Sequence, residues 1–228
     1  MDKPIPGSAA WLDLAREAPI DPERPIIDPH HHLWFALGAR PAYLLADLWA
    51  DTGAGHNIVK TVFVECRAAA REDGPEHLKP VGETEFVAPG RGAEGLYADA
   101  DFRAGVALLG ELGLTYDTWH YHHQNAAFAD LARAVPGTTM VLDHFGTPLG
   151  VGPYAGQREA IFSQWQRDIV AIARCPNVVA KLGGLAMPDN GFGWNQRDRP
   201  ASSDELLEAQ ARYYHHAIAC FGPERCLF

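Results

Sequence analysis

The sequence predicts an α/β protein of the parallel (β/α)8 TIM-barrel type, incomplete, with about six of the eight strands recognisable. Segments rich in β-branched residues alternate with amphipathic segments, which is typical of parallel strands joined by right-handed helical crossovers. Three strand-like segments end in histidines, at His30–His32, His120–His123 and His144. Barrel enzymes carry their active sites at the carboxyl ends of the strands, so these histidines indicate function as well as fold.

The first part of the chain predicts two strands. Ile26 and Ile27 lead directly into Asp28, and the run Ile-Val-Lys-Thr-Val-Phe-Val-Glu that ends at Glu65 is rich in β-branched residues, as buried strands are. In chain order we expect a short helix near residues 9–17, a strand over 24–28, a helix over 44–51, a strand over 58–65 and a helix over 78–87.

The second part alternates strands and helices more regularly. Apolar residues at helical spacing mark each helix, and Ser202 with Glu205 forms a capping box that opens the last helix, which Gly222-Pro223 ends. We expect helices over 102–112, 126–135 and 158–174, a loop over 187–201, and strands over 114–119, 138–143, 177–182 and 225–228.

The strand count falls short of a closed barrel in one region. Between residues 63 and 115 the segment 88–95 has neither an apolar pattern nor a strand. Because barrel radius depends on strand number and shear, we expect an open or distorted barrel, with residues 88–98 irregular and exposed.

Composition restricts the class of protein. The 228 residues are 47% hydrophobic, carry a net charge of -10 and have a pI near 5.5, which argues against nucleic-acid and membrane partners. We expect an N-terminal extension over 1–23, one barrel domain over 24–228, a cytoplasmic location without a secretory signal, and a small-molecule substrate. The oligomeric state stays open. No pair of cysteines has metal-site spacing, so we expect buried free thiols at Cys66, Cys175, Cys220 and Cys226.

The cluster Asp28-Pro29-His30-His31-His32 is the strongest functional signal. Side chains at i and i+2 of a strand share a face, so His30 and His32 project together with Asp28 behind them. Two imidazoles on one strand end suit a divalent metal. The alternative is a chance histidine run or a hydrogen-bonded surface patch.

Together these motifs resemble the amidohydrolase-2 group of the amidohydrolase superfamily, which are TIM-barrel, metal-dependent hydrolases that include sugar lactonases. The residues that carry the resemblance are 27–34, 62–66, 117–124, 141–146, 175–185 and 221–228.

The resemblance implies a hydrolase that opens a lactone or small carboxylic ester with metal-activated water. His30 and His32 would hold the metal, with His122 as a further ligand or a substrate contact. His144 would be a catalytic ligand or a hydrogen-bond donor to the developing oxyanion. The metal would be zinc, with manganese or metal-free operation as alternatives. A metal-dependent decarboxylase and a non-catalytic remnant are the competing interpretations.

Two departures from the family put activity in doubt. Members carry two further strand–helix units after the region Gly82–Glu85, and they continue past the run that ends here at Phe228 to an Asp that serves as general base. We therefore expect an internal deletion and a truncated C-terminus, and weak or absent hydrolysis.

Four further residues have functional and structural alternatives. Glu65 would be catalytic, acting on metal or substrate, or else a structural acid paired with an arginine. Lys181 would clamp a substrate anion or be a salt-bridge partner. Trp34 and Tyr121 would contact substrate, whereas core packing is the expected role of Trp119.

Overall fold

The computed structural model describes residues 3–36, 42–64 and 95–227. The chain groups into two compact units, one from Met1–Arg16 with Gly90–Leu227 and the other from Glu17–Pro89 with Phe228. Each unit is α/β, with strands that pair in parallel. The single domain expected over 24–228 stays a prediction.

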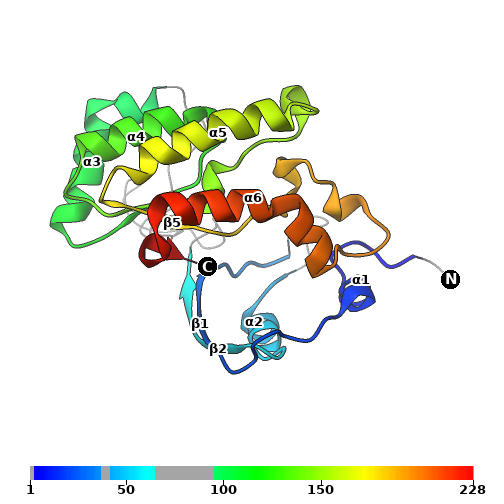
Figure 1. The fold of residues 1–228 in the computed structure, drawn as a ribbon. Helices are drawn as coiled ribbons and strands as arrows, with labels where there is room; N and C mark the ends of the chain where they lie inside the picture. The colour runs from blue at the N-terminus through cyan, green and yellow to red at the C-terminus, as the bar shows by residue number, and fades with distance from the viewer. Residues whose placement is uncertain (1–2, 37–41, 65–94, 228) are drawn as a thin grey trace. The chain divides into compact units, whose positions relative to one another are not determined.

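The smaller unit contains a two-stranded parallel sheet. Strand β1 (Pro25–His31) pairs with β2 (Asn57–Phe63), and helix α2 (Leu45–Thr52) connects them (Figure 1). The register shifts between Asp28 and His31, so the end of β1 is irregular where the histidines lie.

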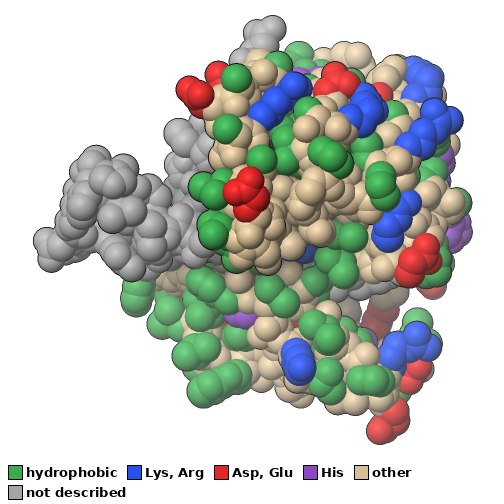
Figure 2. Space-filling model, turned by 90° about the vertical axis from the view of Figure 1, so that its left-hand side faces the viewer, with side chains coloured by type: hydrophobic (Ala, Val, Ile, Leu, Met, Phe, Trp, Pro, Cys, Tyr) green, Lys and Arg blue, Asp and Glu red, His purple; other side chains and the backbone are tan. Residues whose placement is uncertain are grey.

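The surface of this sheet is apolar in places. Ile27, Val59, Val62 and Phe63 each have about half of their surface exposed, between 48% and 54%. Figure 2 shows apolar side chains, in green, at the protein surface. Parallel strands are usually covered on both faces, so this exposure agrees with a barrel that lacks some of its elements.

The larger unit contains a four-stranded parallel sheet in the order β3-β4-β5-β6, which is also the order along the chain. Its helices α4, α5 and α6 follow one another side by side (Figure 1), with α5 packed between the other two. The strands are β3 (Tyr116–Thr118), β4 (Met140–Leu142), β5 (Val178–Lys181) and β6 (Cys226–Leu227); the helices are α1 (Ala9–Leu12), α3 (Ala100–Glu111), α4 (Asn125–Ala134), α5 (Arg158–Ala173) and α6 (Ser203–Phe221).

The pleat of this sheet separates an apolar core from a charged face. One face of the sheet packs against the helices through the side chains of Met140, Leu142, Val178 and Ala180. The helices and their flanks contribute fully buried side chains to this core, namely Phe128, Trp165, Ile169 and Tyr213. Residues alternate between faces along a strand, so Asp117 and Lys181 lie on the opposite face. The sheet therefore presents charged groups on the side away from its helices.

Side chains close the ends of the last helix. The predicted capping box is confirmed, since Ser202 accepts from the Glu205 backbone N–H and Glu205 accepts from that of Ser202. Beyond the helix, the Arg225 guanidinium donates to the carbonyls of Ala173, Cys175, Val178 and Phe221. Arg225 thus ties the ends of α5 and α6 to the start of β5.

The predicted elements agree closely with the described ones, because each is specified by local periodicity and caps. The six expected strands correspond to β1–β6, and the fold class of an incomplete barrel type is confirmed. The helix over 78–87 lies outside the described residues, as do Glu65 and Cys66. The remaining three cysteines are free as expected, but only Cys175 is buried, whereas Cys220 and Cys226 are partly exposed.

One prediction is wrong at its edge. Residues 88–94 lie outside the described residues, but Leu96–Ala98 forms a 3-10 turn and Tyr97 is only 7% exposed. The Tyr97 hydroxyl reaches Thr118 and, at 3.2 Å, His120 Nδ1. Burial of one aromatic ring with a satisfied hydroxyl stabilises a segment that has no periodic pattern. Among the described helices none is long and apolar enough to cross a membrane.

Candidate active site

The two imidazoles at the end of β1 lie against each other. His30 Nε2 and His32 Nε2 are 2.9 Å apart, and the rings meet edge to face at 4.6 Å between centroids. His32 Nδ1 lies 2.6 Å from the Val64 carbonyl oxygen, so Nδ1 carries the proton and Nε2 presents a lone pair. The His30 backbone N–H donates to Asp28 Oδ1 at 3.0 Å. The pairing agrees with the i, i+2 spacing of the sequence.

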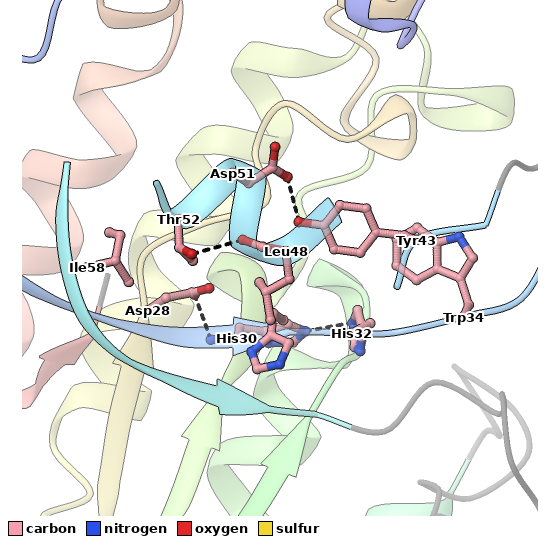
Figure 3. Close-up of a pocket in the computed structure, with 10 residues that line it drawn as sticks. Asp28, His30, His32, Trp34, Tyr43, Leu48, Asp51, Thr52 and Ile58 are labelled. Carbon is pink, nitrogen blue, oxygen red and sulfur yellow. Dashed lines mark hydrogen bonds between the residues drawn. The ribbon is translucent and has the colours of Figure 1, made fainter. Parts of the chain in front are cut away.

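A pocket of about 400 Å³ opens beside these imidazoles, within the smaller unit (Figure 3). Helix α2 supplies one wall and β1 another, so the pocket combines apolar side chains with carboxylates and imidazoles. The lining residues are Asp28, His30, His31, His32, Trp34, Tyr43, Leu48, Asp51, Thr52 and Ile58.

Tyr43 and Asp51 are pocket residues that the sequence did not single out. Trp34 and Tyr43 pair through reciprocal backbone hydrogen bonds of 2.9 Å, and their rings stack at 5.2 Å between centroids. The Tyr43 hydroxyl donates to Asp51. Burial and the adjacent carboxylate raise the pKa of Tyr43 well above its usual value, so the phenol stays protonated. No local motif marks this pair, because Tyr43 pairs with Trp34 through a contact between separate segments.

The chain leaves β4 through a run of left-handed residues. His144, Phe145 and Thr147 have φ values of 50°, 59° and 35°, although none is glycine. Such conformations cost about 1–3 kcal/mol each and cluster at functional sites. The His144 ring meets Trp119 edge to face at 5.3 Å, and a Cβ on Gly184 would lie 2.5 Å from His144 Nδ1. Only glycine fits at position 184.

Lys181 joins two carboxylates on the charged face of the larger sheet. Its Nζ lies 2.9 Å from Asp117 Oδ2 and 3.2 Å from Asp143 Oδ1, and its side chain is 6% exposed. These contacts are the salt-bridge alternative for Lys181, and its role as a substrate clamp stays a prediction. Sequence reasoning missed Asp117 and Asp143, although a charged residue inside a parallel strand signals a buried partner.

Burial and neighbouring charges shift the pKa values of Asp143 and Lys181. Burial raises the pKa of Asp143 to about 7, with the Asp117 charge adding to the effect and Lys181 opposing it. Burial lowers the pKa of Lys181, but the two carboxylates together outweigh it, so the pKa lies above its usual value. The ammonium of Lys181 therefore stays charged beside the two carboxylates.

The histidines after β3 differ from those at the end of β1 in their burial and hydrogen bonds. His120 is 1% exposed, and its Nε2 lies 2.8 Å from Asn125 Oδ1. His122 Nδ1 accepts the Leu149 backbone N–H at 3.2 Å, so the neutral ring keeps its proton on Nε2. Burial lowers the pKa of each ring to about 4. This tautomer suits His122 as a hydrogen-bond donor better than as a metal ligand.

The remaining predicted residues fall in separate places. Tyr121 precedes the 3-10 turn His122–Gln124, and its backbone N–H donates to Gln124 Oε1. Trp119 donates from Nε1 to Thr147 Oγ1 at 2.8 Å and contacts His144, so it packs at the strand ends rather than among the helices. Substrate contact by Trp34 and Tyr121 stays a prediction, as do the roles of His30, His32, His122, His144 and Lys181.

The fold and these side chains define the class of protein: an α/β protein of barrel type with paired imidazoles at the end of a strand. The amidohydrolase family model matches residues 86–228, which is more than half of the chain. The chain belongs to the amidohydrolase family.

Two relatives show how far the sequence similarity extends. The uncharacterized protein y4mH of Sinorhizobium fredii is 26% identical, with 89% of this chain and 83% of that protein covered. The match runs over 274 residues although this chain has 228, so y4mH has internal residues without a counterpart here. L-fucono-1,5-lactonase of Burkholderia multivorans is 28% identical over 133 residues, covering 57% of this chain and 41% of the lactonase.

Solved structures agree on the fold. A zinc-bound amidohydrolase from Burkholderia multivorans superposes with a TM-score of 0.67 at 21% identity, covering 89% of this chain and 82% of that one. Amidohydrolase 2 from Bifidobacterium longum subsp. infantis superposes with a TM-score of 0.57 at 18% identity, with the same coverage of both chains. These proteins share the fold of this chain.

Proposed function

We propose that this protein is a metal-dependent hydrolase that acts on a small lactone or carboxylic ester. The observation that carries the proposal is the pair of Nε2 atoms of His30 and His32, 2.9 Å apart beside a pocket of about 400 Å³. The similarity to a fuconolactonase and to a zinc-bound amidohydrolase supports both the reaction class and the divalent ion.

The donor set fits a divalent metal. Two Zn–N bonds of about 2.0–2.1 Å at a tetrahedral angle place the nitrogens about 3.3 Å apart, close to the spacing here. The Val64 carbonyl fixes the His32 tautomer in which Nε2 directs a lone pair toward His30 Nε2, which is how outer groups orient metal-binding histidines. Zinc is therefore the first ion to test, with manganese second.

The residues around the pocket would have different roles beside such an ion. His30 and His32 would hold it, and when bound it would supply Lewis acidity toward a carbonyl oxygen. Trp34 and Tyr43 form an aromatic wall against which a small ring can lie. The Asp51 carboxylate accepts a hydrogen bond from the Tyr43 hydroxyl and keeps the phenol oriented. A hydrogen bond from His144 to the oxyanion of an opening lactone stays a prediction.

Metal binding is tested independently of turnover. The purified full-length chain is stripped with a chelator and titrated with zinc by calorimetry. Wild-type protein should bind one equivalent, and His32→Ala should weaken binding by at least about 100-fold, since a ligand is lost. His56→Ala, an exposed histidine of the same unit, is the matched control and should bind like wild type.

Turnover is tested with the zinc-loaded protein on a panel of sugar lactones, with acid release followed by a pH indicator. Ring opening that disappears in His32→Ala and persists in His56→Ala supports the proposal. Release of carbon dioxide from carboxylated substrates without acid release would assign a decarboxylase instead. Zinc affinity that is equal in wild type and His32→Ala would refute the metal site.

A further inference from the structure

Three charged side chains connect the ends of neighbouring strands on the face of the larger sheet away from its helices. We call Asp117, Asp143 and Lys181 the Lys181 cluster. Lys181 Nζ lies 2.9 Å from Asp117 Oδ2 on β3 and 3.2 Å from Asp143 Oδ1, directly after β4. Asp143 and Lys181 are 4% and 5% exposed. A single ammonium thus links three adjacent strands.

Asp143 lies where the backbone pairing of β4 stops. The last residues of β3 and β4 that pair in register are Thr118 and Leu142, and Leu142 also pairs with Ala180. Asp143 follows immediately, beyond this ladder. Its side-chain contact with Lys181 therefore constrains the backbone at the first residue after the strand.

The residue held in this way leads directly into His144. The left-handed run at His144, Phe145 and Thr147 needs restraint at both ends, because each residue is in a sparsely populated conformation. Thr147 is held at the far end, where it accepts from Trp119 Nε1 and its carbonyl accepts from the His122 backbone N–H. Lys181, through Asp143, restrains the near end.

Two close neighbours restrict the position of the His144 imidazole. The Trp119 ring meets His144 edge to face, and a Cβ on Gly184 would lie 2.5 Å from His144 Nδ1. A shift of the backbone at Asp143 would move His144 against one of these neighbours. The direction of the imidazole therefore depends on where Asp143 sits.

We propose that Lys181 is a positioning residue, which holds Asp143 by an ion pair and thereby sets the orientation of the His144 imidazole. The inference rests on the proposed function only in that His144 is taken to act on the substrate. Lys181 itself does not need to touch the substrate, because its ammonium is already paired with two carboxylates.

Stability alone does not account for such a cluster. A buried ion pair gains little over apolar side chains of the same volume, because the desolvation of the charges opposes their attraction. A charged bridge does restrict geometry, since the ammonium keeps both short contacts only while the three strand ends stay close together. Orientation of the neighbouring His144 is therefore the property that the cluster serves.

The test compares Lys181→Met with two reference variants in the full-length protein. Lys181→Arg keeps the charge, and Arg212→Met removes a different ion pair, the one between Arg212 and Glu159 that joins α6 to α5. The readouts are the nitrogen-15 NMR signals of the His144 ring, assigned by their loss in His144→Gln, and kcat and KM for a lactone of the panel that the wild type opens.

The expected results separate positioning from folding. Lys181→Met should shift the His144 ring signals and lower kcat by about 10–100-fold with KM within about threefold, since misplacement of a reacting group costs up to about 100-fold. Lys181→Arg should restore most of both. Arg212→Met should leave the His144 signals and kcat unchanged.

A neutral triple variant, with Asp117→Asn, Asp143→Asn and Lys181→Met, guards against simple unfolding because it leaves no buried unpaired charge. If the triple variant folds and its His144 signals match those of wild type, the inference is refuted. If Lys181→Met and the triple variant do not fold, Asp143→Asn decides, because it removes the charge pair with Lys181 and keeps the side-chain shape. Unchanged His144 signals in Asp143→Asn refute the inference, and shifted signals support it. If wild type opens no lactone, the proposed function fails, and the NMR comparison still decides the role of Lys181.

Discussion

Acid sensitivity of folding should depend on His120, which is buried among Tyr97, Thr118 and Asn125. Burial lowers the pKa of His120 from 6.5 to about 4, with the nearby His123 also lowering it and Asn125 opposing. The folded pKa is depressed, so the stability from the neutral ring is complete above pH 6.5 and is lost as the pH falls through about 4. The difference between these two pKa values corresponds to about 3 kcal/mol.

The perturbation is His120→Gln, which keeps polar atoms but cannot titrate. Urea unfolding at intervals between pH 4 and pH 7.5 gives the free energy of unfolding of variant and wild type, provided that the transitions are reversible and two-state. The stability advantage of wild type should shrink by about 3 kcal/mol between pH 7 and pH 4. The exposed neighbour is the control: His123→Gln should track wild type within about 0.5 kcal/mol. A difference between His120→Gln and wild type that stays constant with pH would refute the reasoning.

Three further predictions concern the sheet ends. Asp143→Asn should change the slope of stability against pH. Burial raises the pKa of Asp143 above 3.8, so the stability contribution of this carboxyl is complete below pH 4 and declines as the pH rises toward neutral; parallel slopes in unfolding titrations would contradict this. Gly184→Ala should destabilise by at least about 1–2 kcal/mol, because φ is +84° and the new Cβ meets His144 Nδ1; an unchanged urea midpoint would count against the close packing of His144 on Gly184. Arg225→Met should lower stability by about 2–4 kcal/mol, because it removes the donor to the carbonyls of Ala173, Cys175, Val178 and Phe221; a loss below about 0.5 kcal/mol would show that water replaces the guanidinium.

Local pattern in the sequence determined the elements and where the functional residues concentrate. Strand β5 and helix α6 follow from β-branched runs and a capping box, which act over a few residues. The pairing of His30 with His32 follows from the two-residue repeat of a strand. These features need no knowledge of the rest of the chain.

The tertiary structure determined which side chains contact one another. Lys181 and Asp117 are 64 residues apart, and only the parallel alignment of β3 and β5 around β4 brings them within 2.9 Å. The left-handed run at His144 is likewise invisible in a sequence without glycine at that position, because neighbouring contacts and not local propensity hold it. Contacts between distant segments have no periodicity of their own, so composition and spacing predict where the strands end but not how their side chains pair.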